Sequence, residues 1–171
     1  MEFTDVIRNR VSVRDYDPNK PVPKDVIERI LEAGRIAPSA TNRQPWRFLV
    51  ITSEEMLKKV KESYSADWFQ RAPAVLAVAG RREDAWTRSY DGYNSLETDL
   101  TIAMDHMILA AENEGVGTCW IGAFNPSVLF PALPLKEAET VFALTPLGYP
   151  PQGYQKRHRG RKSLEEIAVF L

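Results

Sequence analysis

The spacing of apolar residues along the chain predicts a mixture of helices and strands. Apolar side chains recur every three or four positions in three segments, which indicates amphipathic helices over residues 2–10, from Pro23 toward Ala37, and over 96–114. Four short, mostly apolar runs predict buried strands at residues 47–52, 74–79, 118–123 and 141–148. Pro146 places the last strand at a sheet edge or a bulge, because proline donates no hydrogen bond to a ladder.

Particular residues mark the ends of these elements. Pro23 suits the start of a helix, where a missing N–H costs nothing, and Gly115 suits the end of one. Ser53 and Asn125 are expected to cap two shorter helices, the second of which runs to about Phe130.

The order of the elements favours an α+β fold. Helices and strands are mixed without regular strand–helix–strand alternation, which argues against a doubly wound parallel sheet. Residues 81–95 are polar and aromatic, and we expect them to form a surface excursion. No repeat and no long linker divides the chain, so residues 1–171 are expected to form one domain.

Composition and charge exclude several classes of partner. The chain has 44% hydrophobic and 26% charged residues and a net charge of −1, so no overall field attracts nucleic acid or an acidic membrane. Cys119 is the only cysteine, which excludes an internal disulfide and favours a reducing compartment. The stretch MEFTDVIRNR does not look like a signal peptide, and charged residues interrupt the apolar pattern at 96–114. We therefore expect a cytoplasmic protein without a membrane span.

Two basic segments are candidates for a phosphate site. Arg10, Ser12 and Arg14 alternate with valines, so an extended backbone would place all three side chains on one face. Guanidinium forks and a hydroxyl are donors that suit a phosphate dianion, while a solvated strand edge with scattered ion pairs explains the same pattern. A second basic run suits a solvated tail, a nucleic-acid contact or the other half of the phosphate site; it contains Arg157, Arg159, Arg161 and Lys162.

The connection before the first expected strand carries more polar side chains than a turn needs. A turn requires one or two special residues, and this one contains Ser39, Thr41, Asn42, Arg43 and Gln44 before Pro45-Trp46. The excess indicates a loop that contacts a ligand. The glycines between 115 and 122 follow a helix and precede a strand, which is the reverse of a dinucleotide fingerprint. Among them, Trp120 suits either the core or a ligand contact.

No cluster of side chains in the sequence indicates protein-based catalysis. The two histidines, His106 and His158, have no metal-ligand spacing with Cys119 or with paired carboxylates, so no metal site is expected. There is no nucleophile elbow and no Cys–His pair. If the protein is an enzyme, a cofactor therefore carries the chemistry.

Taken in order, these segments resemble the nitroreductase family of FMN-dependent oxidoreductases. The matching stretches are RNRVSVRDYDP, APSATNRQPWRF, RAPAVLAV, IAMDHMILAAENEGVGTCWIGAF, ALTPLGYP and RGRKSLEEI. The pattern P-S-x-x-N-x-Q-P-W is the most specific of them. The resemblance implies a three-layer α+β fold, with a central, mainly antiparallel sheet flanked by helices. It also implies a homodimer with its flavin sites at the interface.

The resemblance assigns the basic segments to the FMN phosphate and the flavin edge. Arg10 and Ser12 would hold the phosphate together with Arg159 and Arg161. Arg14 would approach the pyrimidine edge of the flavin and give electrostatic support.

Two further segments would contact the flavin ring. Pro38, Ser39 and Asn42 would reach the flavin of the partner subunit, and Gln44 would hold their loop. A stretch of backbone would run along the ring and offer N–H groups to it; its residues are Trp120, Ile121, Gly122 and Ala123.

The chain departs from the family pattern in two places. Val11 stands where a basic residue is usual, although it is expected to line the same site. Ser65 stands where the family often has an asparagine before the A-P pair. The excursion at 81–95 could supply part of a cover over the pocket.

The activity implied is electron transfer from NAD(P)H to a nitroaromatic, a quinone or a similar small molecule, by a ping-pong mechanism with no catalytic side chain. The alternatives are a dehalogenase or a flavin-fragmenting enzyme of the same fold, or a non-catalytic FMN-binding module. An RNA-binding protein is disfavoured by the net charge.

Overall fold

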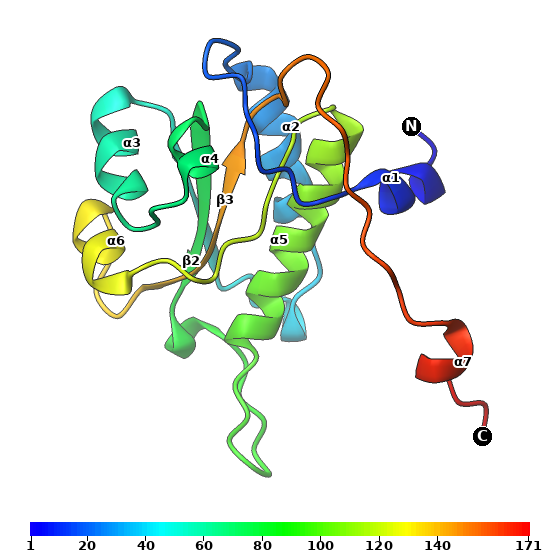
Figure 1. Ribbon diagram of the computed structural model, residues 1–171. Coiled ribbons are helices and arrows are strands. Elements are labelled where there is room, and N and C mark those ends of the chain that lie inside the picture. Colours follow the sequence, from blue (N-terminus) through cyan, green and yellow to red (C-terminus); the bar gives the residue numbers. More distant parts are fainter.

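The structure is a computed structural model that describes residues 1–171 (Figure 1). Its helices are α1 (Phe3–Asn9), α2 (Lys24–Arg35), α3 (Glu54–Lys61), α4 (Asp67–Gln70), α5 (Leu96–Asn113), α6 (Pro126–Ala132) and α7 (Leu164–Ile167). Two 3-10 turns, η1 (Ala40–Asn42) and η2 (Arg82–Asp84), accompany the strands β1 (Trp46–Ile51), β2 (Ala74–Gly80) and β3 (Thr140–Leu147).

The strands form an antiparallel sheet in the order β1-β2-β3. The central strand β2 is buried along its whole length. β3 is an edge strand of this sheet, as Pro146 predicted. β1 is the other edge, and only Ile51 of this strand is buried. The strand predicted to be buried at residues 47–52 is therefore only partly buried, because an edge strand has one side without a neighbour.

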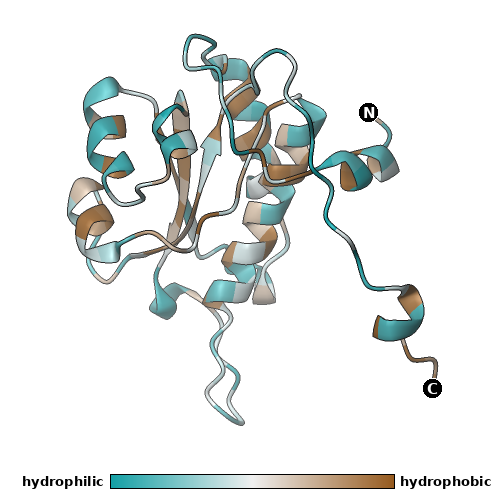
Figure 2. Cartoon of the chain, in the orientation of Figure 1, coloured by the Kyte–Doolittle hydropathy of each residue, from teal (hydrophilic) through white to brown (hydrophobic).

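Helices cover both faces of the sheet (Figure 1). α2 and α5 pack on one face, around a core that includes Ile30, Leu76 and Met104. α3, α4 and α6 lie on the other face, around a second core that includes Phe69 and Leu129. Figure 2 shows the apolar residues concentrated in the strands and on the inner sides of the helices. The expected three-layer α+β arrangement is confirmed.

Most helix boundaries agree with the sequence. The Ser53 hydroxyl accepts a hydrogen bond from Met56 N (3.4 Å), and Asn125 Oδ1 accepts one from Ser127 N (3.0 Å), so both expected caps are present. Gly115 follows α5 with a φ of 73°, a left-handed conformation that favours glycine. α2 begins one residue after Pro23 and ends before Ala37, which is buried outside the helix.

Residues 118–123 do not form the expected strand. They make isolated bridges only, of which one joins Ile121 to Leu144 on β3. The next pair along this register would join Cys119 to Pro146, and proline has no N–H to complete it. Cys119 N donates instead to Thr145 Oγ1 (3.1 Å), so the segment follows the edge of β3 without a continuous ladder.

Two parts of the chain project from the layered body (Figure 1). The expected surface excursion at 81–95 contains η2 and a loop closed by a bridge between Thr87 and Asn94. Beyond Lys156 the chain leaves the body, and α7 lies near its end. The terminal segment has strongly exposed apolar side chains, namely Leu164, Ile167, Val169, Phe170 and Leu171. No helix is both long and apolar enough to span a membrane.

Candidate functional site

The two basic segments of the sequence meet at one cavity of about 870 Å³. One wall is the chain from the end of α1 to Asp15, and the other is the segment 154–161. Six arginines line it: Arg8, Arg10, Arg14, Arg157, Arg159 and Arg161. The same cavity contains Val11, Ser12, Tyr154, Gln155 and His158. The two segments are thus brought together, which the residue pattern had left open and the family resemblance had implied.

The cavity carries positive charge that the protein does not neutralise. None of its six arginines forms an ion pair with a carboxylate. Its one acidic residue, Asp15, is paired with Arg71 outside the cavity (2.7 Å). By contrast, Arg29, Arg35 and Arg47 each have an acidic partner. Unpaired guanidinium groups around a hydroxyl form a donor set that fits a phosphate dianion.

In the first basic segment, small apolar residues that are buried alternate with polar residues that are more exposed. Val11 and Val13 are buried, whereas Arg14 is exposed and Ser12 half-exposed, as expected for an extended chain. Val13 N donates to Thr118 O (2.8 Å), and the Tyr16 hydroxyl donates to Val13 O (2.7 Å). These bonds fix the backbone so that the polar side chains face the cavity.

Gly117 allows this segment to lie close to the chain after α5. A Cβ atom at Gly117 would lie 2.9 Å from Val13 Cγ1, which is too close for any side chain. Glycine is therefore required here because the chain passes close to Val13. It is not required for phosphate binding, as in a dinucleotide fingerprint.

The Arg14 guanidinium lies 6.0 Å from the ring centroid of Trp68, within reach of a cation–π contact. Burial raises the pKa of the Cys119 thiol, and the nearby Arg14 and Ser12 oppose that rise. Burial also raises the pKa of Tyr16. Both groups therefore stay neutral at physiological pH and do not offset the positive charge of the arginines. Ser65 is exposed, in the turn that precedes α4 and Trp68.

The loop between α2 and β1 has a strained backbone. Thr41, Asn42 and Gln44 have φ values of 51°, 55° and 51°, in the left-handed region that non-glycine residues rarely adopt. Gln44 N donates to Ser39 Oγ (2.9 Å), and the Gln44 side chain donates to Asn42 Oδ1 (3.1 Å). Pro38 and Asn42 are exposed. Such strain persists where the surroundings hold it, and it is concentrated at functional sites.

Asp99 anchors this loop, a role that the sequence analysis did not assign to it. It is 2% exposed, and its carboxylate accepts hydrogen bonds from Ala40 N (2.9 Å) and from the Ser95 hydroxyl (2.7 Å). An acidic residue at a buried helical position is a signal that could have found it, because buried carboxylates require hydrogen-bond partners.

The loop and the basic cavity lie at opposite ends of α5. Asp99 is in the first turn of the helix, whereas Glu112 near its other end contacts the segment that lines the cavity, through Lys156. Glu112 comes thirteen positions after Asp99, which corresponds to roughly 20 Å along the helix axis. Pro38, Ser39 and their neighbours are therefore not brought to the arginines within one chain.

The segment after Thr118 runs along the edge of β3. Ser12 and Thr118 form a parallel bridge, which joins this segment to the first basic one. Trp120 is 38% exposed and packs edge-to-face on Phe142, so it is not a core residue. A group of backbone N–H donors has no hydrogen-bond partner in the chain; it belongs to Trp120, Gly122 and Ala123. Ile121 alternates with them and is buried.

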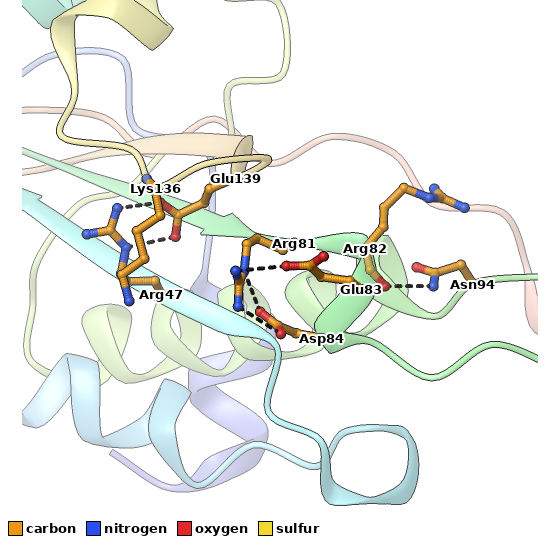
Figure 3. Close-up of polar contacts among 8 residues, drawn as sticks. All are labelled: Arg47, Arg81, Arg82, Glu83, Asp84, Asn94, Lys136 and Glu139. Carbon is orange, nitrogen blue, oxygen red and sulfur yellow. Dashed lines mark hydrogen bonds and ion pairs between the residues drawn. The ribbon is translucent and has the colours of Figure 1, made fainter.

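A second cavity of about 380 Å³ lies beside the loop, at the ends of β1 and β2 (Figure 3). Arg47 forms an ion pair with Glu139, which also accepts a hydrogen bond from Lys136 N (2.8 Å). Arg81 is paired with Glu83 and Asp84, both at 2.8 Å. Because carboxylates that line this cavity neutralise Arg47 and Arg81, it suits an anion less well than the larger one.

Comparison with known proteins agrees with the geometry. The model of the nitroreductase family matches residues 7–66 and 56–149. The chain belongs to the nitroreductase family, which is a family of oxidoreductases.

Relatives of this nitroreductase-family chain cover most of its length. A protein of Archaeoglobus fulgidus, named as a candidate NADH dehydrogenase/NAD(P)H nitroreductase, is 33% identical over 87% of this chain and 86% of its own. A nitroreductase family protein of Clostridium difficile has a TM-score of 0.90 at 30% identity, covering 99% of this chain and 98% of its own. A structure from Desulfovibrio desulfuricans, described as a candidate nitroreductase in complex with FMN, has a TM-score of 0.85 at 27% identity, covering 100% and 97%.

Proposed function

We propose that this protein is an FMN-dependent oxidoreductase that transfers electrons from NAD(P)H to a small organic acceptor. The observation that carries the proposal is the cavity with six arginines that lack acidic partners, next to the Ser12 hydroxyl. A site of this kind fits a phosphate ester, and the free N–H donors of the adjoining segment fit a flat heterocycle with ring nitrogens and carbonyls. Membership of the nitroreductase family and the FMN complex of a similar protein support the same choice.

Different residues would bind different parts of the cofactor. Arg10, Ser12, Arg159 and Arg161 would bind the phosphate, and charge-assisted hydrogen bonds of this type are among the strongest in proteins. Arg14 would place its charge at the pyrimidine edge of the ring, where its cation stabilises negative charge. The unpartnered N–H groups of Trp120, Gly122 and Ala123 would donate to the polar edge of the ring.

When bound, FMN supplies the two-electron chemistry that no side chain of this protein offers. The protein would supply binding, orientation and a cationic environment. No buried acid or base is aimed into the cavity, so protons would come from solvent in an open site.

The site would be completed by a second copy of the chain. The strained loop at 38–44 lies too far along α5 to reach the cavity of its own chain, but its exposed residues can face the cavity of a partner. Exposed apolar side chains at both ends of the chain favour such an assembly; they include Phe3, Ile7, Ile167 and Phe170. Leaving them in water would cost hydrophobic free energy that an interface recovers.

A single open site would take the nicotinamide donor and the acceptor in turn. The glycines at 115–122 end a helix and approach Val13 closely, so they form no dinucleotide pocket. Donor and acceptor would then share one face of the cofactor, which is a ping-pong mechanism.

Anaerobic titration of the FMN-loaded protein with NADH and NADPH tests the proposal. We expect the visible flavin absorbance to bleach with at least one donor and to return when a quinone or nitroaromatic is added. A flavin spectrum that persists with both donors would contradict the reductase and favour a non-catalytic FMN-binding module. A protein that cannot be loaded with FMN would contradict both.

A further inference from the structure

The C-terminal basic segment is tied to the rest of the protein by a lysine and not by its arginines. Lys156 Nζ donates to Asn9 O (3.1 Å) and forms an ion pair with Glu112 near the end of α5. The Glu112 side chain is only 8% exposed. This contact joins α1, α5 and the segment that continues to Arg161, although Asn9 and Lys156 are 147 residues apart.

Lys156 is the last tether before the chain leaves the body. Arg161 donates only to carbonyls of its own segment, those of Arg159 and Gly160. No residue between Lys156 and Ser163 hydrogen-bonds to the body of the protein. On the other side of Lys156, the Tyr154 hydroxyl accepts a hydrogen bond from Arg14 N (3.4 Å). These two ties hold the segment across the first basic one.

We propose that Lys156, held by Glu112, is a positioning residue for the FMN phosphate. Lys156 does not line the cavity, so it acts by fixing where Arg159 and Arg161 begin. A segment already held against Asn9 loses less conformational entropy when its arginines close on a phosphate than a free tail would. This inference rests on the proposed FMN site and assigns two residues to it that do not touch the ligand.

The variant Glu112→Gln distinguishes a positioning role from an effect of overall charge, because the two explanations predict opposite changes in FMN affinity. Removing a negative charge near the cavity would tighten FMN if only the overall field mattered. Loosening the Lys156 tether would weaken FMN. We expect the dissociation constant of FMN to rise about five- to tenfold, and that of riboflavin, which lacks the phosphate, to change less than about twofold.

Three matched variants complete the experiment. Glu114→Gln makes the same charge change at the same end of α5, in a residue that is paired with Arg29 instead. We expect it to leave FMN affinity unchanged or slightly tighter. Lys156→Ala should weaken FMN as Glu112→Gln does, and Lys156→Arg should restore binding because a guanidinium can keep the ion pair.

Trypsin provides a readout that needs no cofactor. In the FMN-free protein, cleavage between residues 157 and 162 should be faster in Glu112→Gln than in Glu114→Gln. Equal cleavage rates would show that there is no tether and overturn the inference. Tighter FMN binding in Glu112→Gln, or equal losses for FMN and riboflavin, would also overturn it. If the unmutated protein fails to bind FMN, the proposed function is contradicted, and so is this inference, which rests on it.

Discussion

Asp99 and Ala40 connect the long central helix to the strained loop, through a hydrogen bond of 2.9 Å from Ala40 N to Asp99 Oδ1. At the other end of the same helix, Glu112 holds Lys156 and so the C-terminal basic segment. α5 thus positions two polar regions that lie far apart in the sequence. Both are held by buried carboxylates, which are costly in a helix unless they make such bonds.

Replacing Asp99 with asparagine should release the loop. An amide has one acceptor oxygen where the carboxylate has two, so Ala40 N or the Ser95 hydroxyl loses its partner. We expect the free energy of unfolding to fall by about 1–3 kcal/mol in urea denaturation. Asp105→Asn, an exposed position on the same helix, is the control and should change stability by less than about 0.5 kcal/mol. Equal effects at the two positions would refute the anchor.

Arg10→Ala and Arg161→Ala should each weaken FMN about ten- to hundredfold, because each removes a charge-assisted hydrogen bond to the phosphate. Riboflavin should lose much less affinity. Arg82, which also lacks an acidic partner but lies outside the cavity, supplies the control variant Arg82→Ala. Fluorescence titration measures both ligands. Equal losses of FMN and riboflavin would mean that the arginines only support the fold.

The protein should sediment as a homodimer at low micromolar concentration when loaded with FMN. The physical reason is that the loop at 38–44 and the arginine cavity cannot meet within one chain. Obligate interfaces of this kind often bury more than about 2,000 Å². A stable, FMN-loaded monomer in sedimentation velocity would contradict the two-chain site.

Arg14→Ala should lower the reduction potential of bound FMN. A cation at the pyrimidine edge stabilises the negative charge that accumulates there on reduction, so its loss disfavours the reduced cofactor. Reduction by NAD(P)H should slow, while phosphate affinity should change little. Redox titration against a reference dye measures the potential, and an unchanged value would remove this role from Arg14.

Initial rates supply an independent check on the shared site. Double-reciprocal plots should be parallel when donor and acceptor are varied, because each must leave before the other binds. Intersecting lines would indicate a complex with both substrates bound and would contradict the ping-pong mechanism.

The ion pair of Arg47 with Glu139 should make stability depend on pH. The hydrogen bond from Arg47 lowers the pKa of Glu139 from its ordinary value of 4.5. A carboxyl with a lowered pKa in the folded state stabilises the protein above its unfolded pKa, and that contribution is lost as the pH falls through the folded value. At pH 7, Glu139→Gln should therefore cost about 1–3 kcal/mol in the free energy of unfolding.

The same difference should shrink as the pH falls below about 4, because the wild-type carboxylate then becomes protonated. Glu137→Gln serves as the control, since Glu137 is exposed and forms no ion pair. A cost that stays constant from pH 7 to pH 3 would show that ionisation of Glu139 is not its source.

Local sequence determined the elements and some of the site. Helical spacing located α1, α2 and α5, and the caps at Ser53 and Asn125 located α3 and α6, since these signals act over a few residues. The alternation of Arg10, Ser12 and Arg14 with valines correctly gave one polar face, because the period of an extended chain is two residues. The family resemblance identified the second basic run as its partner.

The tertiary structure decided which distant groups meet and which do not. Residues 118–123 have a strand-like composition, but Pro146 on the neighbouring strand lacks the N–H that would complete their ladder. Whether an arginine is neutralised depends on carboxylates from other elements, so the free charge of the cavity is invisible in the sequence. Asp99 and Glu112 acquire their partners only when the fold brings Ala40 and Lys156 to the two ends of α5. Short-range periodicity encodes the elements, whereas long-range pairing depends on how the folded layers pack against each other.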